Sequence, residues 1–480
     1  MSVAGDKMKT MAFAQVRLNT PQGRWILLAT VLGSGMAMLD STVVNVALPF
    51  IGDDLNADMA GLQWTINAYT LTLAGLILLG GGLGDRYGRR KIFLIGTVWF
   101  ALASALCGLA PTIEILNLSR ALQGVGGALL TPGSLAIIQA SFCREDRPRA
   151  VGAWSGLGGV ASAIGPLLGG WLVQGPGWRW AFLINLPFAA LVVWVTLRHV
   201  PETRDEQAHG RFDVAGSVLA ALALAGITYG LIESGAPIPL GLGIALAIAF
   251  VVLEIRRSPD ALVPVGLFSD RVFSAINVVT LIMYGAMGIV FFLLGVQLQV
   301  VSGFSPIAAG SALLPVTILM MLLSARAGEV AKRIGPRWPM TIGILVAALG
   351  FVWLAYVGEG SSYWLQVIPA VTVFGLGLSA AVAPLTATVL ASADERYAGT
   401  ASGVNNAVAR TGSLLMVAAI PPLVGLVGNA FEDPALFDAG YKQAMWISAV
   451  LMVVSALLTF VTIRTNVLVD DREAVPDSRS

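Results

Sequence analysis

The chain has 480 residues, of which 56% are hydrophobic and only 12% are charged, with a formal net charge of +1. Soluble domains carry about 25% charged residues, so this composition excludes an ordinary soluble protein and predicts an all-α membrane protein that crosses the bilayer many times. The near-zero net charge gives no reason to expect a nucleic-acid partner. Cys107 and Cys143 have no metal-ligand neighbours in the sequence, so we expect neither a metal site nor a disulfide.

Apolar runs near the 20-residue length of a membrane-spanning helix predict fourteen spans. No cleavable signal precedes the first run, which we expect to be retained. The runs cover roughly 25–51, 62–83, 92–111, 113–139, 151–173, 178–198, 214–233, 238–256, 272–300, 306–326, 338–357, 363–391, 398–427 and 441–463.

Basic residues concentrate in alternate loops. Arg89 and Arg90, and later Arg147 and Arg149, lie in one set of loops, whereas acidic residues such as Asp53 dominate the other set. The positive-inside rule therefore predicts a multi-pass protein of the cell membrane with both termini in the cytoplasm.

An internal repeat divides the chain. The turn around Gly88 recurs around Gly335, and the segment at Gly152 recurs at Gly399, with an offset of 247 residues in each case. Such repeats predict two bundles around a midplane binding site with alternating access. We expect a cytoplasmic N-terminus (1–24), a six-helix bundle (25–199), a cytoplasmic linker (200–213), two inserted helices (214–257), a second six-helix bundle (258–464) and a cytoplasmic tail (465–480).

The first span contains an acid, Asp40, in the stretch LDSTVVNVALP. A carboxylate at that depth is costly unless it is protonated, paired or facing a wet cavity. It is therefore a candidate proton carrier, and the alternative is a permanent structural partner. The repeat offset places Met287 at the equivalent position of the second half, and this asymmetry favours a coupling role.

Arg120 lies within the fourth span, where a guanidinium needs a carboxylate, a carbonyl or water. It can stabilise the deprotonated form of an intramembrane acid, so we pair it with Asp40 in proton coupling. Snorkelling of Arg120 to the interface is the alternative. Its repeat equivalent is Val367, again without charge.

Two glycine-rich stretches are candidates for gating. The turn from Gly81 to Lys91 reads GGLGDRYGRRK, and Asp85 within it can dock at a helix N-terminus and pair with a base. The fifth span contains AIGPLLGG, where small residues allow close packing and the proline allows a bend. The candidate latch and gating residues are Gly81, Gly84, Asp85, Arg86, Gly88, Arg89, Arg90, Gly165, Pro166 and Gly169.

Polar and aromatic residues within the spans are candidates for a substrate cavity, with helix packing or an interfacial belt as the alternative for each. Arg410 is a second intramembrane charge, for which we expect a cavity-facing or gating role; a structural partner for backbone carbonyls is the alternative. The set comprises Asn45, Trp64, Asn67, Tyr69, Gln123, Trp154, Tyr284, Gln297, Asn405, Asn406 and Arg410.

Several of these motifs resemble the major facilitator superfamily. GGLGDRYGRRK is similar to its signature between the second and third helices. LDSTVVNVALP, RALQGVGGALLTPGS, AIGPLLGG and WRWAFLINLP resemble motifs of its fourteen-helix drug/proton antiporter branch. The resemblance implies a major facilitator fold of two six-helix bundles plus two inserted helices, with rocking between the bundles. It also implies proton coupling through Asp40 and Arg120.

The resemblance favours a secondary transporter that exports amphipathic or cationic drugs or antibiotics in exchange for protons. The absence of a phosphate-binding loop argues against ATP as the energy source, so we expect no cofactor beyond the proton gradient. A lipid or lipid-like metabolite transporter on the same fold is the alternative. His199 and His209 flank a loop, so the sequence does not suggest an enzyme. We expect a monomer in the bilayer whose partners are protons and a small amphipathic substrate.

Overall fold

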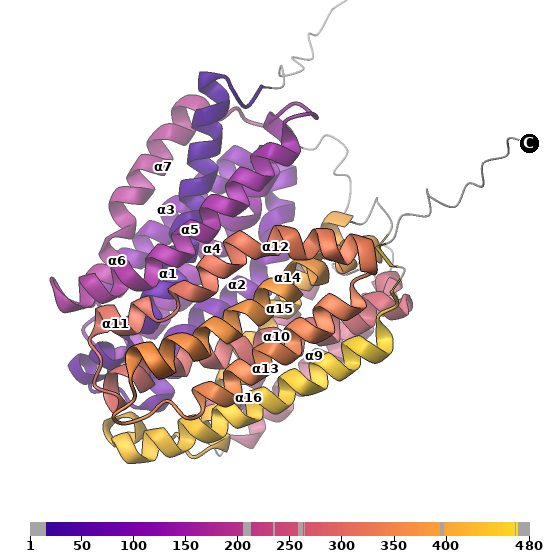
Figure 1. The fold of residues 1–480 in the computed structure, drawn as a ribbon. Coiled ribbons are helices and arrows are strands. Elements are labelled where there is room, and N and C mark those ends of the chain that lie inside the picture. The colour runs from indigo at the N-terminus through magenta and orange to yellow at the C-terminus, as the bar shows by residue number, and fades with distance from the viewer. Residues whose placement is uncertain are drawn as a thin grey trace, which may run out of the picture.

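The computed structural model describes residues 16–204, 213–233, 236–257, 263, 265–393, 398–465 and 467–468. Most of the predicted linker, the first fifteen residues and nearly all of the predicted tail lie outside the described residues. Helices make up the fold of the described residues, apart from one isolated bridge between Val16 and Phe142 (Figure 1).

The helices follow the predicted order. The first bundle contains α1 (Pro21–Leu55), α2 (Met59–Tyr87), α3 (Arg89–Gly108), α4 (Ile113–Ser141), α5 (Arg147–Gln174), α6 (Trp180–Leu183) and α7 (Asn185–His199). The insert is α8 (Val214–Ile232) and α9 (Pro237–Arg257). The second bundle contains η1 (Val265–Ser269), α10 (Arg271–Val296), η2 (Gln297–Val301), α11 (Pro306–Ser311), α12 (Leu314–Ile334), α13 (Arg337–Leu354), η3 (Tyr363–Val367), α14 (Ile368–Ala391), α15 (Ala398–Leu423), η5 (Ala430–Glu432) and α16 (Pro434–Thr462).

Thirteen helical segments of the described chain are long and apolar enough to cross a membrane. The α15 helix is not among them, although its 26 residues are sufficient in length. Asn405, Asn406 and Arg410 lower its hydropathy. With α15 included, the described helices account for the fourteen predicted spans.

The helix boundaries recur at the offset of the sequence repeat. The α2 helix covers Met59–Tyr87, and α11 with α12 covers Pro306–Ile334, so both ends are 247 residues apart. The next residue is a glycine with positive φ in each half, 110° at Gly88 and 83° at Gly335. Glycine adopts such angles without the steric cost that other residues meet. The two halves therefore use the same turn after their second span.

The two bundles contact each other at one end of the molecule, opposite the end where the described chain begins and stops. The Met59 N–H donates to the Gly428 carbonyl at 2.7 Å, and Gln63 Nε2 donates to the Val417 carbonyl at 2.7 Å. The end of α5 also packs on α11, where Gly170 faces Ile307. These contacts close one end of the molecule.

The opposite end is open along α5. A Cβ atom placed on Gly152, Gly156 or Gly159 would meet no atom within 4 Å. Figure 1 shows α5 and α12 diverging toward the end of the molecule that carries the termini. The two bundles are therefore separated along α5 and α12 at this end, although α2 and α15 still touch where Gly403 faces Leu78.

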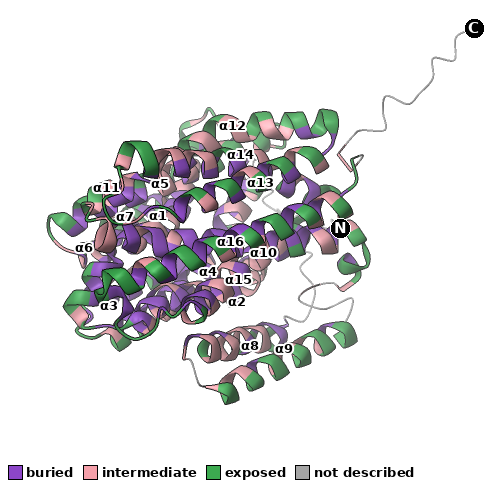
Figure 2. Ribbon diagram, turned by 60° about the horizontal axis from the view of Figure 1, so that its bottom comes forward, coloured by how far each residue is buried: buried purple, intermediate pink, exposed green. Residues whose placement is uncertain are grey.

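The inserted helices form a pair at the edge of the molecule. The α8 helix packs against α2 and α15, one helix from each bundle, and α9 packs on the outside of α8. Figure 2 shows this pair beside the main body, with α9 largely exposed. The insert thus covers the seam between α2 and α15.

Two neighbouring glycines of α2 differ in how closely they approach α4. A Cβ on Gly80 would collide with the Ala128 carbonyl of α4, whereas a Cβ on Gly81 would lie 3.6 Å from Pro132. We expect Gly80→Ala to lower the free energy of unfolding by about 1–3 kcal/mol, because the backbone of α4 must shift. Gly81→Ala is the matched control and should be neutral or slightly stabilising, because alanine favours the helix. Unfolding titrations in mixed micelles measure both, and equal effects would contradict this packing.

Candidate functional site

Asp40 is fully buried at the middle of α1 and its carboxylate is saturated with donors. Oδ2 accepts from Arg120 at 2.6 Å, and Oδ1 accepts from Gln123 Nε2 at 2.8 Å and Asn185 Nδ2 at 2.9 Å. These donors come from α4 and α7. Such charge-assisted bonds are the strong ones in proteins, so the predicted pair of Asp40 and Arg120 forms the centre of a buried network.

Arg120 is 1% exposed and has partners besides the carboxylate. Its Nε donates to the Thr65 carbonyl at 3.0 Å, and Nη1 also donates to Gln123 Oε1 at 2.6 Å. The guanidinium carbon lies 4.4 Å from the centre of the Tyr69 ring, a cation–π distance. Arg120 therefore keeps two acceptors and an aromatic face if Asp40 loses its charge.

Two residues that the sequence analysis did not assign complete the network. Ser104 Oγ accepts from Gln123 at 3.1 Å and from Asn185 at 2.9 Å, and donates to the Phe182 carbonyl at 2.8 Å. Asn185 lies in the motif WRWAFLINLP, which could have identified it as a candidate site residue. Ser104 lies in no such motif, so the sequence gives no reason to select it. These bonds fix the amides of Gln123 and Asn185 toward Asp40.

The ion pair is satisfied within a single bundle. A buried ion pair is stable only while the polar atoms of both partners are satisfied. Arg120 also donates to the Thr65 carbonyl and to Gln123, so part of its hydrogen bonding does not depend on Asp40.

The Arg410 side chain of α15 approaches this network from the second bundle. It interacts electrostatically with Tyr69, beneath Arg120, and with Tyr284 of α10. Its Nε is buried without a hydrogen-bond partner. An unpaired guanidinium donor between the two bundles is a ready partner for an acceptor on a ligand or for water.

The other candidate cavity residues fall into two groups. Asn67 lies near the network on α2, and both polar atoms of its buried amide lack partners. Trp154 Nε1 donates to Ser34 at 3.1 Å across α5 and α1, while the Asn45 amide donates back to the Ser41 carbonyl. These residues lie along the inner helices of the first bundle.

The remaining candidates are elsewhere. Trp64 packs on Tyr229 of the insert, with ring centres 6.0 Å apart. Gln297 donates to the Val357 carbonyl at 2.8 Å and to Asp438, so it ties together helices of the second bundle. Asn405 donates to Asn277 and Thr280 of α10, and its neighbour Asn406 is exposed. These contacts join helices and do not bring the residues to Asp40.

The predicted latch is built around an ion pair inside one turn. Asp85 pairs with Arg89 at 2.7 Å, and the Asp85 side chain is 40% exposed. Arg86 lies over the ring of Tyr87 at 5.7 Å. Exposed pairs four residues apart contribute only about 0.3–0.5 kcal/mol. Asp85 and Arg89 pair within one loop of the first bundle, so this ion pair does not hold the second bundle.

A different acid occupies the N-terminus of α3. Glu202, from the chain that follows α7, accepts from the backbone N–H groups of Arg90 and Lys91 at 3.1 Å each. A Cβ on Gly88 would lie 2.6 Å from this carboxylate, which a shift of the flexible Glu202 side chain could relieve, whereas the φ of 110° itself favours glycine. The sequence analysis placed Asp85 in such a position, and the structure places Glu202 there.

The glycines of the predicted helix-five motif lie where helices touch. A Cβ on Gly165 would collide with Thr42 of α1, and one on Gly169 would come within 3.0 Å of the Val43 carbonyl. Gly310 of α11 packs directly on the Pro166 carbonyl. Pro166 interrupts the hydrogen bonding of α5. The motif is therefore the contact between α5, α1 and the second bundle at the closed end.

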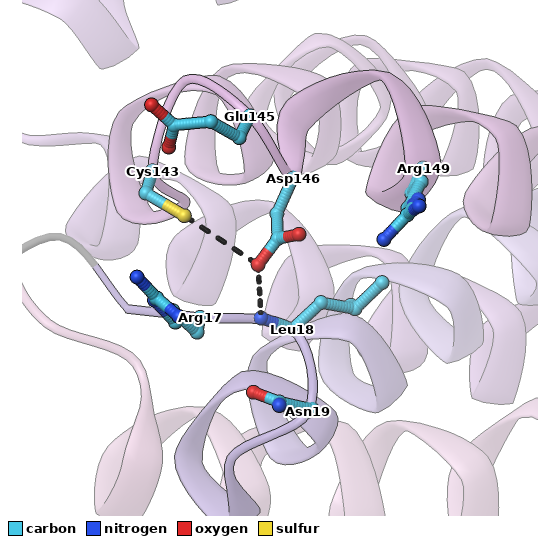
Figure 3. A pocket seen from close by; sticks show the side chains of 7 residues that line it. All are labelled: Arg17, Leu18, Asn19, Cys143, Glu145, Asp146 and Arg149. Atoms are coloured by element: carbon cyan, nitrogen blue, oxygen red, sulfur yellow. Dashed lines mark hydrogen bonds between the residues drawn. The ribbon is translucent and has the colours of Figure 1, made fainter.

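The start of the described chain is fastened to the loop before α5 (Figure 3). Asp146 accepts from the Leu18 N–H at 2.9 Å and from the Cys143 thiol at 3.4 Å. The Leu18 N–H lowers the pKa of the Asp146 carboxyl, which also lies near Arg149 and Arg17. The pocket that these residues line is thus a docking point for the chain leading into α1.

Removal of one partner of the buried pair tests its energetic role. We expect Arg120→Met to lower the free energy of unfolding by about 3–5 kcal/mol, because it leaves the Asp40 charge buried and unpaired. The double variant Asp40→Leu with Arg120→Met should recover most of that loss, since no charge remains. Denaturant titration in mixed micelles measures both variants. A double variant as unstable as the summed single effects would contradict the pairing.

A family model described as Major Facilitator Superfamily matches residues 30–417. A tetracenomycin C resistance and export protein of Streptomyces glaucescens is 35% identical over 418 residues, covering 85% of this chain and 77% of the relative. A puromycin resistance protein of Streptomyces alboniger is 33% identical over 478 residues, covering 95% and 93%.

Among solved structures, a POT family transporter in complex with 5-aminolevulinic acid has a TM-score of 0.71 at 14% identity, with 92% of this chain and 96% of that chain covered. At 14% identity this similarity supports the fold and says nothing about the substrate. The sequence matches and the helical fold agree with the resemblance found in the motifs. The chain therefore belongs to the major facilitator superfamily, as a multi-pass membrane protein whose relatives include antibiotic resistance and export proteins.

Proposed function

We propose that the chain exports small amphipathic or cationic compounds, antibiotics among them, from the cytoplasm in exchange for protons. The observation that carries this proposal is the buried network of Asp40, Arg120 and Gln123. It supplies one carboxylate that can take up and release a proton inside a transporter fold. The relatives whose names describe antibiotic resistance and export support the substrate class.

The asymmetry of the two ends supports alternating access. The bundles are joined at the end where α5 meets α11, and α5 and α12 part at the end that carries the termini. With both termini in the cytoplasm, as the basic loops predict, this conformation is open to the inside. A rocking motion would open the contact at Gly170 and Gly310 and close the gap beside Gly156.

Proton and substrate exclude one another in this scheme. An inward-open protein binds substrate while Asp40 gives up its proton to the cytoplasm, and Arg120 stabilises the resulting carboxylate. After the change to the outward state, Asp40 takes up a proton and the substrate leaves. The cycle needs no cofactor, and we assign it to a monomer.

Transport of a lipid or lipid-like metabolite is the second candidate function. It is favoured by an apolar cavity of about 500 Å³ beneath the insert. A vesicle screen over cationic dyes, antibiotics and lipids, with and without a pH gradient, separates the two functions. Transport of lipids alone, independent of the gradient, would replace the first proposal.

Neutralising the buried acid tests the coupling. We expect Asp40→Asn to abolish efflux driven by an imposed pH gradient in inverted vesicles, because the site can no longer exchange a proton. Asp54→Asn is the matched control on the same helix, where the carboxylate is 47% exposed and pairs with Arg179. The control should retain efflux, and survival of pH-driven efflux in Asp40→Asn would show that the coupling assignment is wrong.

Asp85 should affect the rate of transport and not the affinity for substrate. We expect Asp85→Asn to slow turnover by roughly tenfold, equal to about 1.4 kcal/mol on the barrier, because a state that the latch stabilises becomes less populated. Substrate binding should change little, since Asp85 contacts Arg89 outside the network. Efflux rates and equilibrium binding in the same preparation measure this, with the exposed Glu145→Gln as control. A large loss of affinity would contradict a gating role.

A further inference from the structure

The seam between the two bundles beneath the insert contains a second site. A cavity of about 500 Å³ lies between α2, α8, α9, α15 and η1. Its wall is apolar, with Leu78 from α2, Leu224 from α8, Phe250 from α9 and Val404 from α15. The volume is that of a small-molecule pocket, and both bundles contribute to it.

One carboxylate of this wall is buried and incompletely satisfied. Glu254 of α9 lines the cavity and is 2% exposed. Its Oε2 accepts from the Val263 N–H at 2.6 Å, whereas Oε1 accepts from no N–H or O–H group of the described residues and faces the Asp213 carboxyl. Burial of an acceptor without a partner is costly, and more so for a charged group. Glu254 near the end of α9 is a second buried carboxylate, besides Asp40, within a predicted span.

A second carboxylate meets the first at the start of α8. Asp213 caps α8 by accepting from the Gly216 N–H at 2.7 Å and also pairs with Arg257, both through Oδ1. Its Oδ2 has no hydrogen-bond partner. A Cβ on Gly216 would lie 2.6 Å from that oxygen and 2.7 Å from Glu254 Oε1. The two unsatisfied oxygens therefore converge on one point.

Among the described residues, the charges at this point do not balance when both carboxyls are ionised. Asp213 and Glu254 then carry two negative charges, and Arg257 supplies one positive charge. The remaining negative charge lies at the end of an apolar cavity. Two free carboxylate oxygens are too few for Ca²⁺, which takes six to eight oxygen ligands. An ammonium group offers three N–H donors and one positive charge, and an attached apolar chain would fill the cavity.

We propose that this cavity binds amphipathic primary amines, with the ammonium group on Asp213 and Glu254 and the apolar body among α2, α8, α9 and α15. The site is separate from the Asp40 network, which lies within the first bundle. Because it lies on the seam at the edge of the molecule, it holds such compounds next to the two bundles before transport. That entry role rests on the proposed export function, whereas the binding does not.

Protection of an introduced cysteine tests the binding directly. Ala220→Cys places a thiol on the α8 wall of the cavity, in a Cys143→Ser background where Cys107 is fully buried. The protein is held in phosphatidylcholine nanodiscs, and the rate of modification by a methanethiosulfonate reagent is measured with dodecylamine or dodecanol. We expect dodecylamine to slow the modification and dodecanol, at equal concentration, to have little effect.

Variants assign the protection to the carboxylates. Glu254→Gln should raise the half-protecting concentration of dodecylamine about tenfold, the loss of one charge-assisted hydrogen bond. Glu233→Gln, the same change at the far end of α8, is the matched control and should leave it unchanged. Leu224→Trp fills the cavity without altering charge and should abolish protection. Size-exclusion profiles confirm that each variant is folded.

Three results would overturn the proposal. Equal protection by dodecanol would show that the ammonium group is not recognised, and unchanged protection in Glu254→Gln would remove the carboxylates from the site. Phosphatidylethanolamine carries the same primary ammonium group, so protection by this lipid in the nanodiscs, without added amine, would assign the cavity to a membrane lipid and overturn the entry role for transported compounds. Failure of pH-driven efflux in the wild-type protein would overturn the proposed function and leave these protection measurements unaffected.

Discussion

The structure depends on one buried charge pair. Asp40 and Arg120 are almost completely removed from solvent, and five further groups from α2, α3, α4, α6 and α7 bond to them or to their partners. A charge in an apolar bundle is tolerated only when it is paired and fully hydrogen-bonded. In the proposed scheme, protonation of Asp40 would change the balance of every bond around it. We infer that this sensitivity is the basis of transport, and that the glycine contacts of α5 pass the change on to the second bundle.

The two bundles share helix boundaries and turns but differ in the charged residues within their helices. The 247-residue repeat reproduces helix boundaries and the glycine turns at Gly88 and Gly335. It does not reproduce Asp40, Arg120 or Asp85, whose equivalents are Met287, Val367 and Lys332. The second bundle contributes Arg410 instead, which interacts electrostatically with Tyr69 of the first bundle. In the proposed scheme the first bundle therefore handles the proton, and Arg410 is the charge of the second bundle placed to meet a substrate.

Much of this organisation could be predicted from the sequence because membrane helices are limited by length and hydropathy. The fourteen spans and the closeness of Asp40 to Arg120 followed from runs of apolar residues and from the cost of burying a charge. Other parts depend on long-range packing that no local pattern encodes. Ser104 looks like any serine in a membrane helix, yet it supports Gln123 and Asn185. Glu202 follows α7 in the chain and caps α3, a contact that only the folded chain creates. Glu254 lies near the end of α9, and the packing of α8 on α9 buries it against Asp213.

The central claim is that Asp40 carries the proton that is exchanged for substrate. Proton release on substrate binding tests it most directly. The purified protein is placed in weakly buffered detergent solution with a pH indicator, and a transported compound identified in the vesicle screen is added. The account predicts that the wild-type protein releases protons in proportion to bound substrate, and that Asp40→Asn binds the compound without releasing any. Equal proton release by Asp40→Asn would contradict the account and assign the proton to another group.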